Sequence, residues 1–234
     1  ILTVTVKRGG ILIGAFDGDR MVGFVYSLPA LRHGQPTQWS HMLGVIEAFR
    51  SSGLGYELKQ LQRERALAMG IKLIEWTFDP MQAMNAHLNF SKIGVVAEEY
   101  EVNAYGNSTS PLHRGNPTDR LVAQWWIDVP RPRTIEPSSA FAINRLDSTG
   151  PWAKCVDLNL TCKEDRVSID IPIGFGAMLA LAPDLALAWR LATRDLFTAY
   201  LSSGYLVVDF TLDRSAGKGS YILSREAKPG DGRL

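Results

Sequence analysis

The first part of the chain alternates apolar runs with turn residues in the pattern of an antiparallel meander. An apolar run from Ile11 to Phe16 is followed by Asp17-Gly18-Asp19, and a second run starts at Met21. Glycine accepts the positive φ that a tight hairpin turn requires. We therefore predict strands over 11–16, 21–28 and 39–46, with a hairpin turn at 17–19 and a loop over 29–36.

A helix is predicted over 56–69, and Gly70 stands where a left-handed cap glycine belongs. Apolar residues recur there at i, i+4 and i+7, which is the spacing of one helix face. The spacing assigns Leu54, Leu58, Leu61, Arg65 and Ala68 to the inner face, and Lys59, Arg63 and Glu64 to the outer face.

The short apolar run 71–78, bounded by glycine and proline, indicates a buried strand. Asp79 and Pro80 are typical of the cap and first position of a helix, which we expect to run to Ile93 and stop at Gly94. A further strand is expected over 95–105.

The best boundary is the proline-rich run VPRPRTIEPSS at 129–139. It suggests two domains, residues 1–130 and 131–234. The second half alternates strand-like runs with one strong helix at 183–203, whose stripe through Trp189 indicates core packing. Strands are expected at 124–129, 141–146, 155–161, 166–171, 205–212 and 220–223.

Composition narrows the class of protein. The 234 residues are 46% hydrophobic and 21% charged, which is typical of a globular chain, and the net charge is +1. A balanced charge gives no bulk attraction to nucleic acid or to an anionic membrane. No apolar run approaches the ~20 residues that span a bilayer, and no signal peptide is recognisable. We therefore expect a cytoplasmic protein without nucleic-acid or membrane partners.

Cysteine chemistry contributes little. Cys155 and Cys162 are the two cysteines, and no CxxC pair or cluster with zinc-ligand spacing occurs. Two reduced, partly buried thiols are expected, and no metal.

The segment from His41 to Ala66 carries the chemistry: a strand enters a glycine turn, and the turn opens a helix. Gly53 and Gly55 remove side chains where a ligand could approach the backbone. The first N–H groups of a helix have no partner within it, and with the positive end of the helix dipole they suit a pyrophosphate. Arg50 adds a permanent charge with two donors.

Three phosphate-binding patterns place glycines in a turn of this kind. The P-loop run GxxxxGK[ST] is absent, and the dinucleotide fingerprint GxGxxG fails because Leu58 stands where its third glycine is needed. The run Arg50-Ser51-Ser52-Gly53-Leu54-Gly55 does match [QR]-x-x-G-x-[GA], the coenzyme A pyrophosphate motif of the GNAT superfamily of acyltransferases. A purely structural glycine turn is the alternative.

The chain therefore resembles the GNAT superfamily over about residues 9–105. VIEAFRSSGLG is similar to the family's V-x-P-x-x-R-x-x-G-x-G run, and Ala86, Lys92 and Gly94 match its second signature. The run 105–126 (YGNSTSPLHRGNPTDRLVAQWW) resembles an uncharacterised GNAT-like group with a C-terminal extension. Such relatives begin with a strand and one or two helices, whereas only Ile1 to Arg8 precede the first hairpin here, which suggests a shortened N-terminus.

The resemblance implies an α/β fold with a mixed, splayed β-sheet flanked by helices, plus a C-terminal α/β region. Acetyl-CoA or another acyl-CoA would lie between the strand ending at Ile46 and the strand starting at Ile71, with its thioester near His41 to Leu43. The implied cofactor-binding residues are Leu43, Gly44, Val45, Arg50, Ser51, Ser52, Gly53, Leu54, Gly55, Tyr56, Asn85, Asn89 and Phe90.

Two positions depart from the family pattern. Phe90 aligns with the tyrosine that usually protonates the leaving thiolate, and a phenyl ring cannot donate a proton. Ala83 aligns with the usual asparagine, for which Asn85 and Asn89 are nearby replacements.

Candidate catalytic groups are His41 and Tyr105. An imidazole with a pKa near 6.5 suits removal of a proton from an amine, so His41 is the candidate base, with Glu47 as a rival. A strand histidine bonded to backbone is the equally weighted alternative. Tyr105 is the candidate acid in place of the missing tyrosine, against simple packing on the Gly106 turn.

The resulting expectation is an N-acyltransferase that passes an acetyl or short acyl group from acyl-CoA to a primary amine of a small molecule or amino acid. The alternative is a non-catalytic acyl-CoA-binding or regulatory protein. The sequence leaves open whether the chain forms a homodimer.

Overall fold

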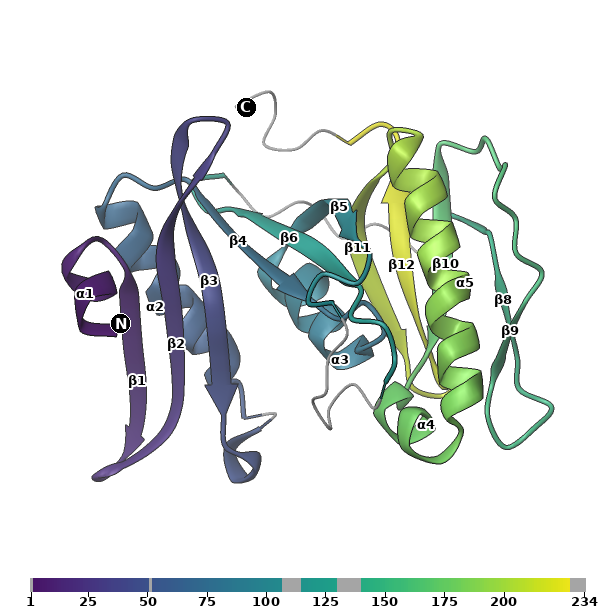
Figure 1. Cartoon of the computed structure of the whole chain (residues 1–234), viewed down its shortest axis with the longest axis horizontal. Coiled ribbons are helices and arrows are strands. Elements are labelled where there is room, and N and C mark those ends of the chain that lie inside the picture. Colours follow the sequence, from purple (N-terminus) through teal and green to yellow (C-terminus); the bar gives the residue numbers. More distant parts are fainter. Residues whose placement is uncertain (1, 51, 107–114, 130–139, 228–234) are drawn as a thin grey trace. The chain divides into compact units, whose positions relative to one another are not determined.

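The computed structural model describes residues 2–50, 52–106, 115–129 and 140–227 (Figure 1). The chain forms two compact units, residues 1–76 with 124–131, and residues 77–123 with 132–233. Strands β4 (Leu73–Phe78) and β6 (Arg120–Trp126) contribute residues to both.

The first unit is built on a meander that continues into a crossover helix. Strands β1 (Ile11–Asp17), β2 (Arg20–Arg32) and β3 (Gln35–Val45) pair antiparallel in sequence order. Helix α2 (Leu54–Ala68) then connects β3 to β4, which pairs with β3 in parallel. A short helix, α1 (Leu2–Lys7), precedes β1. This mixed sheet with flanking helices confirms the predicted fold class.

The first hairpin confirms the predicted turn. Asp17 pairs with Arg20, and Gly18 has φ of 57°. The loop predicted over 29–36 is wrong, because β2 and β3 continue to a tight turn at His33 and Gly34, whose φ values of 47° and 77° are both left-handed. The prolines that suggested a loop lie where the strands have one neighbour only: β1 pairs with β2 no further than Ser27, and β4 meets β3 from Gln38 onward.

Helix α2 buries a different face from the one predicted. Its buried residues are Leu58, Lys59, Gln62 and Ala66. The outward placement of Lys59 was wrong, since this side chain is 2% exposed, whereas Leu61 is largely exposed. Apolar spacing alone missed this face because two of its members are polar and find partners in the interior. Gly70 caps the helix as predicted, with φ of 76° and the Ile71 N–H bonded to the Ala66 carbonyl at 3.0 Å.

The second unit is an α/β layer of its own. Its strand order runs β6, β5 (Val96–Glu101), β11 (Leu206–Asp213), β12 (Lys218–Ser224), β10 (Arg166–Pro172) and β7 (Phe141–Ala142). The long helix α5 (Pro183–Ser202) buries Trp189 fully, as predicted. Because β5 pairs with β11, residues 77–123 share this sheet with the C-terminal half.

Several elements of the second unit differ from the prediction. The helix expected from Asp79 to Ile93 is a short α3 (Ala83–Ala86) followed by a π-helical segment, His87–Ile93, although Gly94 ends it as expected with φ of 84°. Asp79 is not the helix cap, because its carboxylate accepts the Met81 N–H and binds Arg190 instead. Helix α4 (Phe175–Leu181) was not predicted, and a left-handed Gly174 precedes it. The remaining pair is β8 (Arg145–Asp147) with β9 (Lys154–Val156).

Cys155 and Cys162 are free and half-buried, as expected. Within the described ranges, no helix is both long and apolar enough to cross a membrane.

The second unit contains a buried ion pair that we expect to be important for stability. The Arg190 guanidinium donates to both Asp79 carboxylate oxygens at 2.8 and 2.9 Å, and its side chain is 3% exposed. Replacing Arg190 with methionine would leave Asp79 without its partner in a low-dielectric site. We expect the free energy of unfolding to fall by about 3 kcal/mol.

The matched control is Arg145→Met, because Arg145 pairs with Asp157 at 2.9 Å on the surface of the same unit. Exposed pairs contribute less than about 1 kcal/mol. Urea unfolding monitored by circular dichroism measures both variants, and similar losses for the two would contradict the prediction.

Candidate functional site

The edge of β3 that faces β4 loses its partner halfway along the strand. β3 pairs with β4 at Gln38 with Ile74 and at Trp39 with Glu75, yet β3 continues to Val45. Over residues 40–45 the strand is paired with β2 on one side only. A strand edge of this kind presents free N–H and C=O groups to any extended ligand.

A β-bulge lies at the start of this free edge. Tyr26 pairs with Met42 and Ser27 with Ser40, so His41 is an extra residue without a partner on β2. Bulges bend a strand and redirect side chains, and they are frequent beside active sites. The His41 side chain is exposed and packs edge-on against the Tyr26 ring at a centroid distance of 6.2 Å.

Beyond the bulge, the backbone N–H and C=O groups of successive residues point alternately toward β2 and away from it. The Ile46 N–H donates to the Val22 carbonyl at 3.0 Å, so the ladder to β2 uses every second residue, and Leu43 and Val45 present their N–H and C=O groups away from β2. The Val45 carbonyl accepts a hydrogen bond from Arg50 Nε at 3.3 Å. Packing within the sheet favours glycine at position 44, because a Cβ there would lie 2.9 Å from the Phe24 ring.

A compact turn links this edge to α2. After the 3₁₀ turn η1 (Glu47–Phe49), the Ser52 hydroxyl donates to the Phe49 carbonyl at 2.7 Å. Gly53 precedes the helix with φ of 95°, and its carbonyl accepts the N–H groups of Tyr56 and Glu57 at 2.9 and 3.1 Å. The Leu54 N–H lies 3.4 Å from Ser52 Oγ. Ser51 lies outside the described residues.

The two glycines of the turn differ in what requires them. Gly53 needs to be glycine for its backbone, because L-residues are strained at this φ. Gly55 is not among the residues with positive φ, and a Cβ on it would meet only Leu43 Cδ2 at an ordinary 3.9 Å. No contact in the described part of the chain therefore requires glycine at 55, whereas a ligand lying against the helix N-terminus would.

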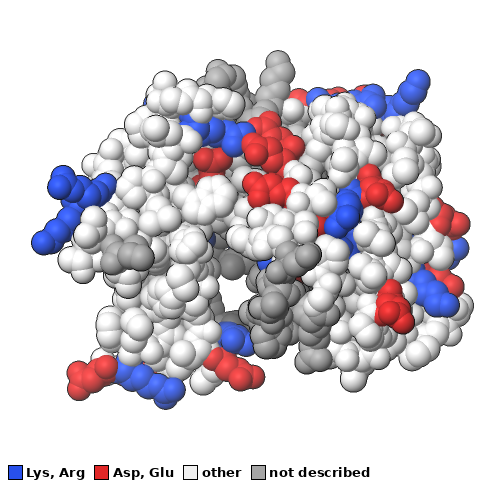
Figure 2. Space-filling view, in the orientation of Figure 1, with Lys and Arg blue, Asp and Glu red and all other residues white. Residues whose placement is uncertain are grey.

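Charge at the turn comes from Arg50, whose side chain is exposed beside the helix N-terminus. The rest of the surface is mixed: Figure 2 shows basic and acidic side chains interspersed on the face in view, as expected for a net charge of +1. A single exposed arginine beside the positive end of a helix dipole suits a small anionic group.

The predicted site residues of the second unit are placed as follows. Asn85 is exposed on α3. Asn89 is buried, and its backbone carbonyl accepts hydrogen bonds from the N–H groups of Gly94 and Val95. Phe90 is 2% exposed and packs edge-on against Phe78 and Tyr221.

Tyr105 is 59% exposed in the second unit, and its hydroxyl lies 2.8 Å from Thr77 Oγ1. The Arg120 guanidinium sits over its ring at 5.1 Å. His41 and the glycine turn belong to the first unit, and Tyr105 belongs to the second.

Two carboxylates could compete with His41 for the role of base, and their surroundings differ. Glu47 is exposed in the 3₁₀ turn. Glu75 is buried on β4 and pairs with Arg32 at 2.8 Å, which leaves it a structural ion pair rather than a base at the turn.

Sequence reasoning missed a buried polar cluster beneath the free strand edge. Lys59 Nζ donates to Ser40 Oγ at 2.8 Å and to Gln62 Oε1 at 3.2 Å. Burial lowers the pKa of the Lys59 amine well below its ordinary value. The sequence did hold a signal for this buried face. Lys59 and Gln62 follow Leu58 by one and four residues and so lie on the same side of the helix, which also carries Gly55.

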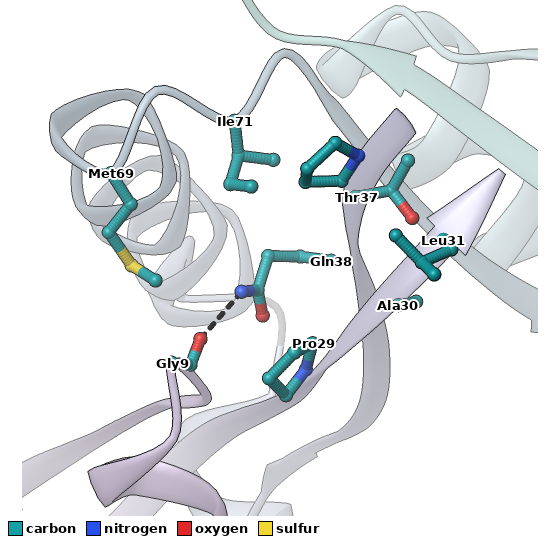
Figure 3. A pocket seen from close by; sticks show the side chains of 9 residues that line it. Gly9, Pro29, Ala30, Leu31, Thr37, Gln38, Met69 and Ile71 are labelled. Atoms are coloured by element: carbon teal, nitrogen blue, oxygen red, sulfur yellow. Dashed lines mark hydrogen bonds between the residues drawn. The ribbon is translucent and has the colours of Figure 1, made fainter. Parts of the chain in front are cut away.

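A separate pocket of about 500 Å³ lies at the other end of α2. Apolar residues line it, including Leu31, Met69 and Ile71, and the Gln38 amide spans to the Gly9 carbonyl at 2.7 Å (Figure 3). It contains none of the predicted site residues and lies at the opposite end of a helix about 20 Å long from the glycine turn. We therefore assign the candidate site to the free β3 edge and the turn.

No family model and no curated protein matches the sequence. Among solved structures, the chain is similar to a GNAT family acetyltransferase from Elizabethkingia anophelis with acetyl-CoA bound, at 19% identity and a TM-score of 0.45, over 53% of this chain and 81% of that one. It is also similar to aminoglycoside 6'-acetyltransferase type Ii, at 21% identity and a TM-score of 0.43, over 56% and 76%. It is similar as well to an acetyltransferase of the GNAT family from Streptococcus pneumoniae, at 19% identity and a TM-score of 0.43, over 52% of this chain and 70% of that one.

The contrast between the two glycines predicts opposite effects on stability. Gly53→Ala forces an L-residue into a left-handed conformation and should lower the free energy of unfolding by about 1 kcal/mol. Gly55→Ala should raise it by about 0.5–1 kcal/mol, because alanine favours the helix and its Cβ has room. Urea unfolding of both variants tests this, and a loss of stability in Gly55→Ala would show that packing, not a ligand, requires this glycine.

Proposed function

We propose that the chain is an N-acyltransferase that transfers an acetyl or short acyl group from acyl-CoA to a primary amine of a small molecule or amino acid. The observation that carries this proposal is the free edge of β3 over residues 40–45, which leads directly into a glycine turn and a helix N-terminus. Such an arrangement offers an extended amide ligand a strand to pair with and its phosphates a place to bind.

The pyrophosphate of the acyl-CoA would bind at the N-terminus of α2. The turn supplies backbone N–H groups and the positive end of the helix dipole, and Arg50 supplies a full charge. The room left at Gly55 supports close approach of the phosphates to the backbone.

The pantetheine arm would pair with β3 as an added strand. Its amides can bond to the outward N–H and C=O groups of Leu43 and Val45. The Leu43 side chain is 37% exposed and offers an apolar contact beside this edge. Pairing in this register would put the thioester near the bulge at His41.

Acyl transfer would proceed by direct attack. His41, itself or through water, takes a proton from the ammonium group, and the amine nitrogen forms a bond to the thioester carbonyl carbon. The carbon–sulfur bond then breaks and the thiolate leaves. The thiolate takes up a proton, for which Tyr105, whose hydroxyl is bonded to Thr77, is the candidate donor, and the second proton of the attacking nitrogen is released to solvent and replaces the one that the donor gives up. Orientation of both reactants and backbone polarisation of the carbonyl would supply much of the rate.

The acceptor is proposed to be small. The net charge of +1 and the mixed charges on the visible face provide no field for a highly charged macromolecule (Figure 2). We propose no metal, because direct attack on a thioester needs none.

One observation favours a second candidate, an acyl-CoA-binding protein without turnover. Phe90 occupies the place where the family resemblance expects a proton-donating tyrosine, and it is packed among aromatic rings. Binding and turnover experiments separate the two candidates.

The first experiment is calorimetric titration with acetyl-CoA and with CoA. The native chain should bind both, and Arg50→Ala should weaken binding about tenfold because a charge-assisted contact is lost. Gly55→Ala should also weaken binding although the fold is not destabilised. Arg145→Ala, an exposed arginine of the other unit, is the control and should bind normally. A native chain that binds neither ligand would refute the proposed function.

The role of His41 is tested by turnover. With an amine acceptor identified by thiol release, His41→Ala should lower kcat by about 10²-fold or more while the Kd for acetyl-CoA stays unchanged, because loss of a general base affects the chemical step. Equal losses in affinity and rate would instead assign His41 to the shape of the bulge. Binding without any thiol release across a broad amine screen would favour the non-catalytic candidate.

A further inference from the structure

His41 and Tyr26 lie on the same face of the sheet in the first unit, the face turned away from α2. A Cβ on Gly23 would meet the side chains of Leu54 and Leu58 in α2 at 3.3 Å, so Gly23 faces the helix. Side chains alternate along a strand, and β2 pairs regularly with β3 from Gly23 to Tyr26, so Tyr26 faces the other way. His41 packs edge-on against the Tyr26 ring and therefore lies on this face as well.

The Tyr26 hydroxyl is a buried polar group without a partner. The residue is 4% exposed, and its hydroxyl oxygen forms no hydrogen bond within the part of the chain that the structure describes. A buried tyrosine hydroxyl usually has a partner, because an unpaired one loses its hydration without compensation. Phenylalanine would fill the same space without this cost. The hydroxyl therefore destabilises the free protein, and a bound group that pairs with it would explain its presence.

The side chains around Tyr26 on this face are apolar. Its cross-strand neighbours are Leu12 on β1 and Met42 on β3, which are 45% and 48% exposed. Phe24 precedes it by two residues on β2 and is half-buried. Residues that face each other across two strands lie on the same side of the sheet. A molecule bound beside His41 would therefore contact mainly carbon atoms, and the burial of apolar surface would stabilise it.

These strands offer no cation to a carboxylate bound beside His41. Strands β1, β2 and β3, which the structure describes in full, contain two arginines, Arg20 and Arg32, and no lysine. Each arginine is six residues from Tyr26 along β2, about 20 Å in an extended strand, and Arg32 is paired with Glu75 at 2.8 Å. A carboxylate on this face would lose water without gaining a partner, which is unfavourable.

We propose that the acceptor is a primary amine with an uncharged, apolar body, which lies on this face with its nitrogen between His41 and the Tyr26 hydroxyl. This inference rests on the proposed function for the role of His41 as the base, and it narrows the acceptor from small amines in general. The Tyr26 hydroxyl accepts a hydrogen bond from an N–H of the amine and so orients the nitrogen. Met42 is flexible and half-exposed, so it can turn outward and admit the amine to the hydroxyl.

The first test compares three acceptors that share one skeleton: 2-phenylethylamine, phenylalanine and phenylalaninamide. With saturating acetyl-CoA, kcat/KM for 2-phenylethylamine should exceed that for phenylalanine at least about tenfold, because only phenylalanine brings a carboxylate to this face. Phenylalaninamide, whose carboxyl group is uncharged, should also be used better than phenylalanine. Equal use of the three amines, or a preference for phenylalanine, would overturn the proposal.

The second test is Tyr26→Phe, which keeps the ring that contacts His41 and removes the hydroxyl. The KM for 2-phenylethylamine should rise about tenfold, because one hydrogen bond to the amine is lost. The Kd for acetyl-CoA should stay unchanged, and the midpoint of urea unfolding should equal or exceed that of the wild type. A tyrosine with a structural role alone would give a lower midpoint with an unchanged KM, and this result would contradict the proposal.

The third test is Met42→Lys, which places a cation next to Tyr26 on this face. The ratio of kcat/KM for 2-phenylethylamine to that for phenylalanine should fall at least about tenfold, since the new ammonium group can pair with the carboxylate. The control is Met69→Lys, because Met69 is similarly exposed, at 45%, and follows the other end of α2 in the same unit. The control should keep the ratio of the wild type. An unchanged ratio in Met42→Lys would show that the acceptor does not lie on this face.

The outcomes separate this inference from the proposed function. If the wild type does not bind acetyl-CoA, or binds it without acetylating any amine, acyl transfer fails, and calorimetric titration with 2-phenylethylamine decides the acceptor site. No binding of this amine, or equal binding by Tyr26→Phe, then overturns the site. If the wild type binds acetyl-CoA and acetylates phenylalanine in preference to 2-phenylethylamine, this inference fails and the proposed function stands.

Discussion

Parallel pairing holds β3 and β4 together only at Gln38 with Ile74 and at Trp39 with Glu75. The candidate site depends on this limit. A longer ladder would bond more of the β3 edge within the sheet. The bulge at His41 adds to the effect, since it bends β3 at the same place where β4 departs.

Two buried cations, Arg190 and Lys59, are accommodated differently, and the contrast is informative. In the second unit, Arg190 is paired with Asp79 through two hydrogen bonds, so its burial contributes to a defined structure. In the first unit, Lys59 is satisfied by two oxygens and an aromatic ring without a counter-ion. A paired charge can be explained by the fold alone, whereas an unpaired one calls for a reason in positioning or binding.

Local signals in the sequence were reliable where the backbone itself decides the structure. Gly18, Gly70 and Gly94 occupy left-handed positions at turns and helix ends, as predicted. The helix start at Asp79 failed for a non-local reason: its carboxylate is taken by Arg190, a residue far away in the chain. The loop expected between Pro29 and Pro36 failed because proline is tolerated where a strand has a single neighbour, and neighbours are a property of the sheet.

The sequence by itself determined the strand–turn–helix segment, with Gly53, Gly55 and Arg50 beside the helix N-terminus, because spacing and backbone preference are local. Only the tertiary structure decided which face of α2 is buried and that His41 is a bulged residue. It also decided that Ser40, Lys59 and Trp76 meet where β3 and β4 stop pairing. These features depend on the register between strands and on contacts between distant residues, and a polar residue in a buried stripe is indistinguishable from a solvated one until its partners are in place.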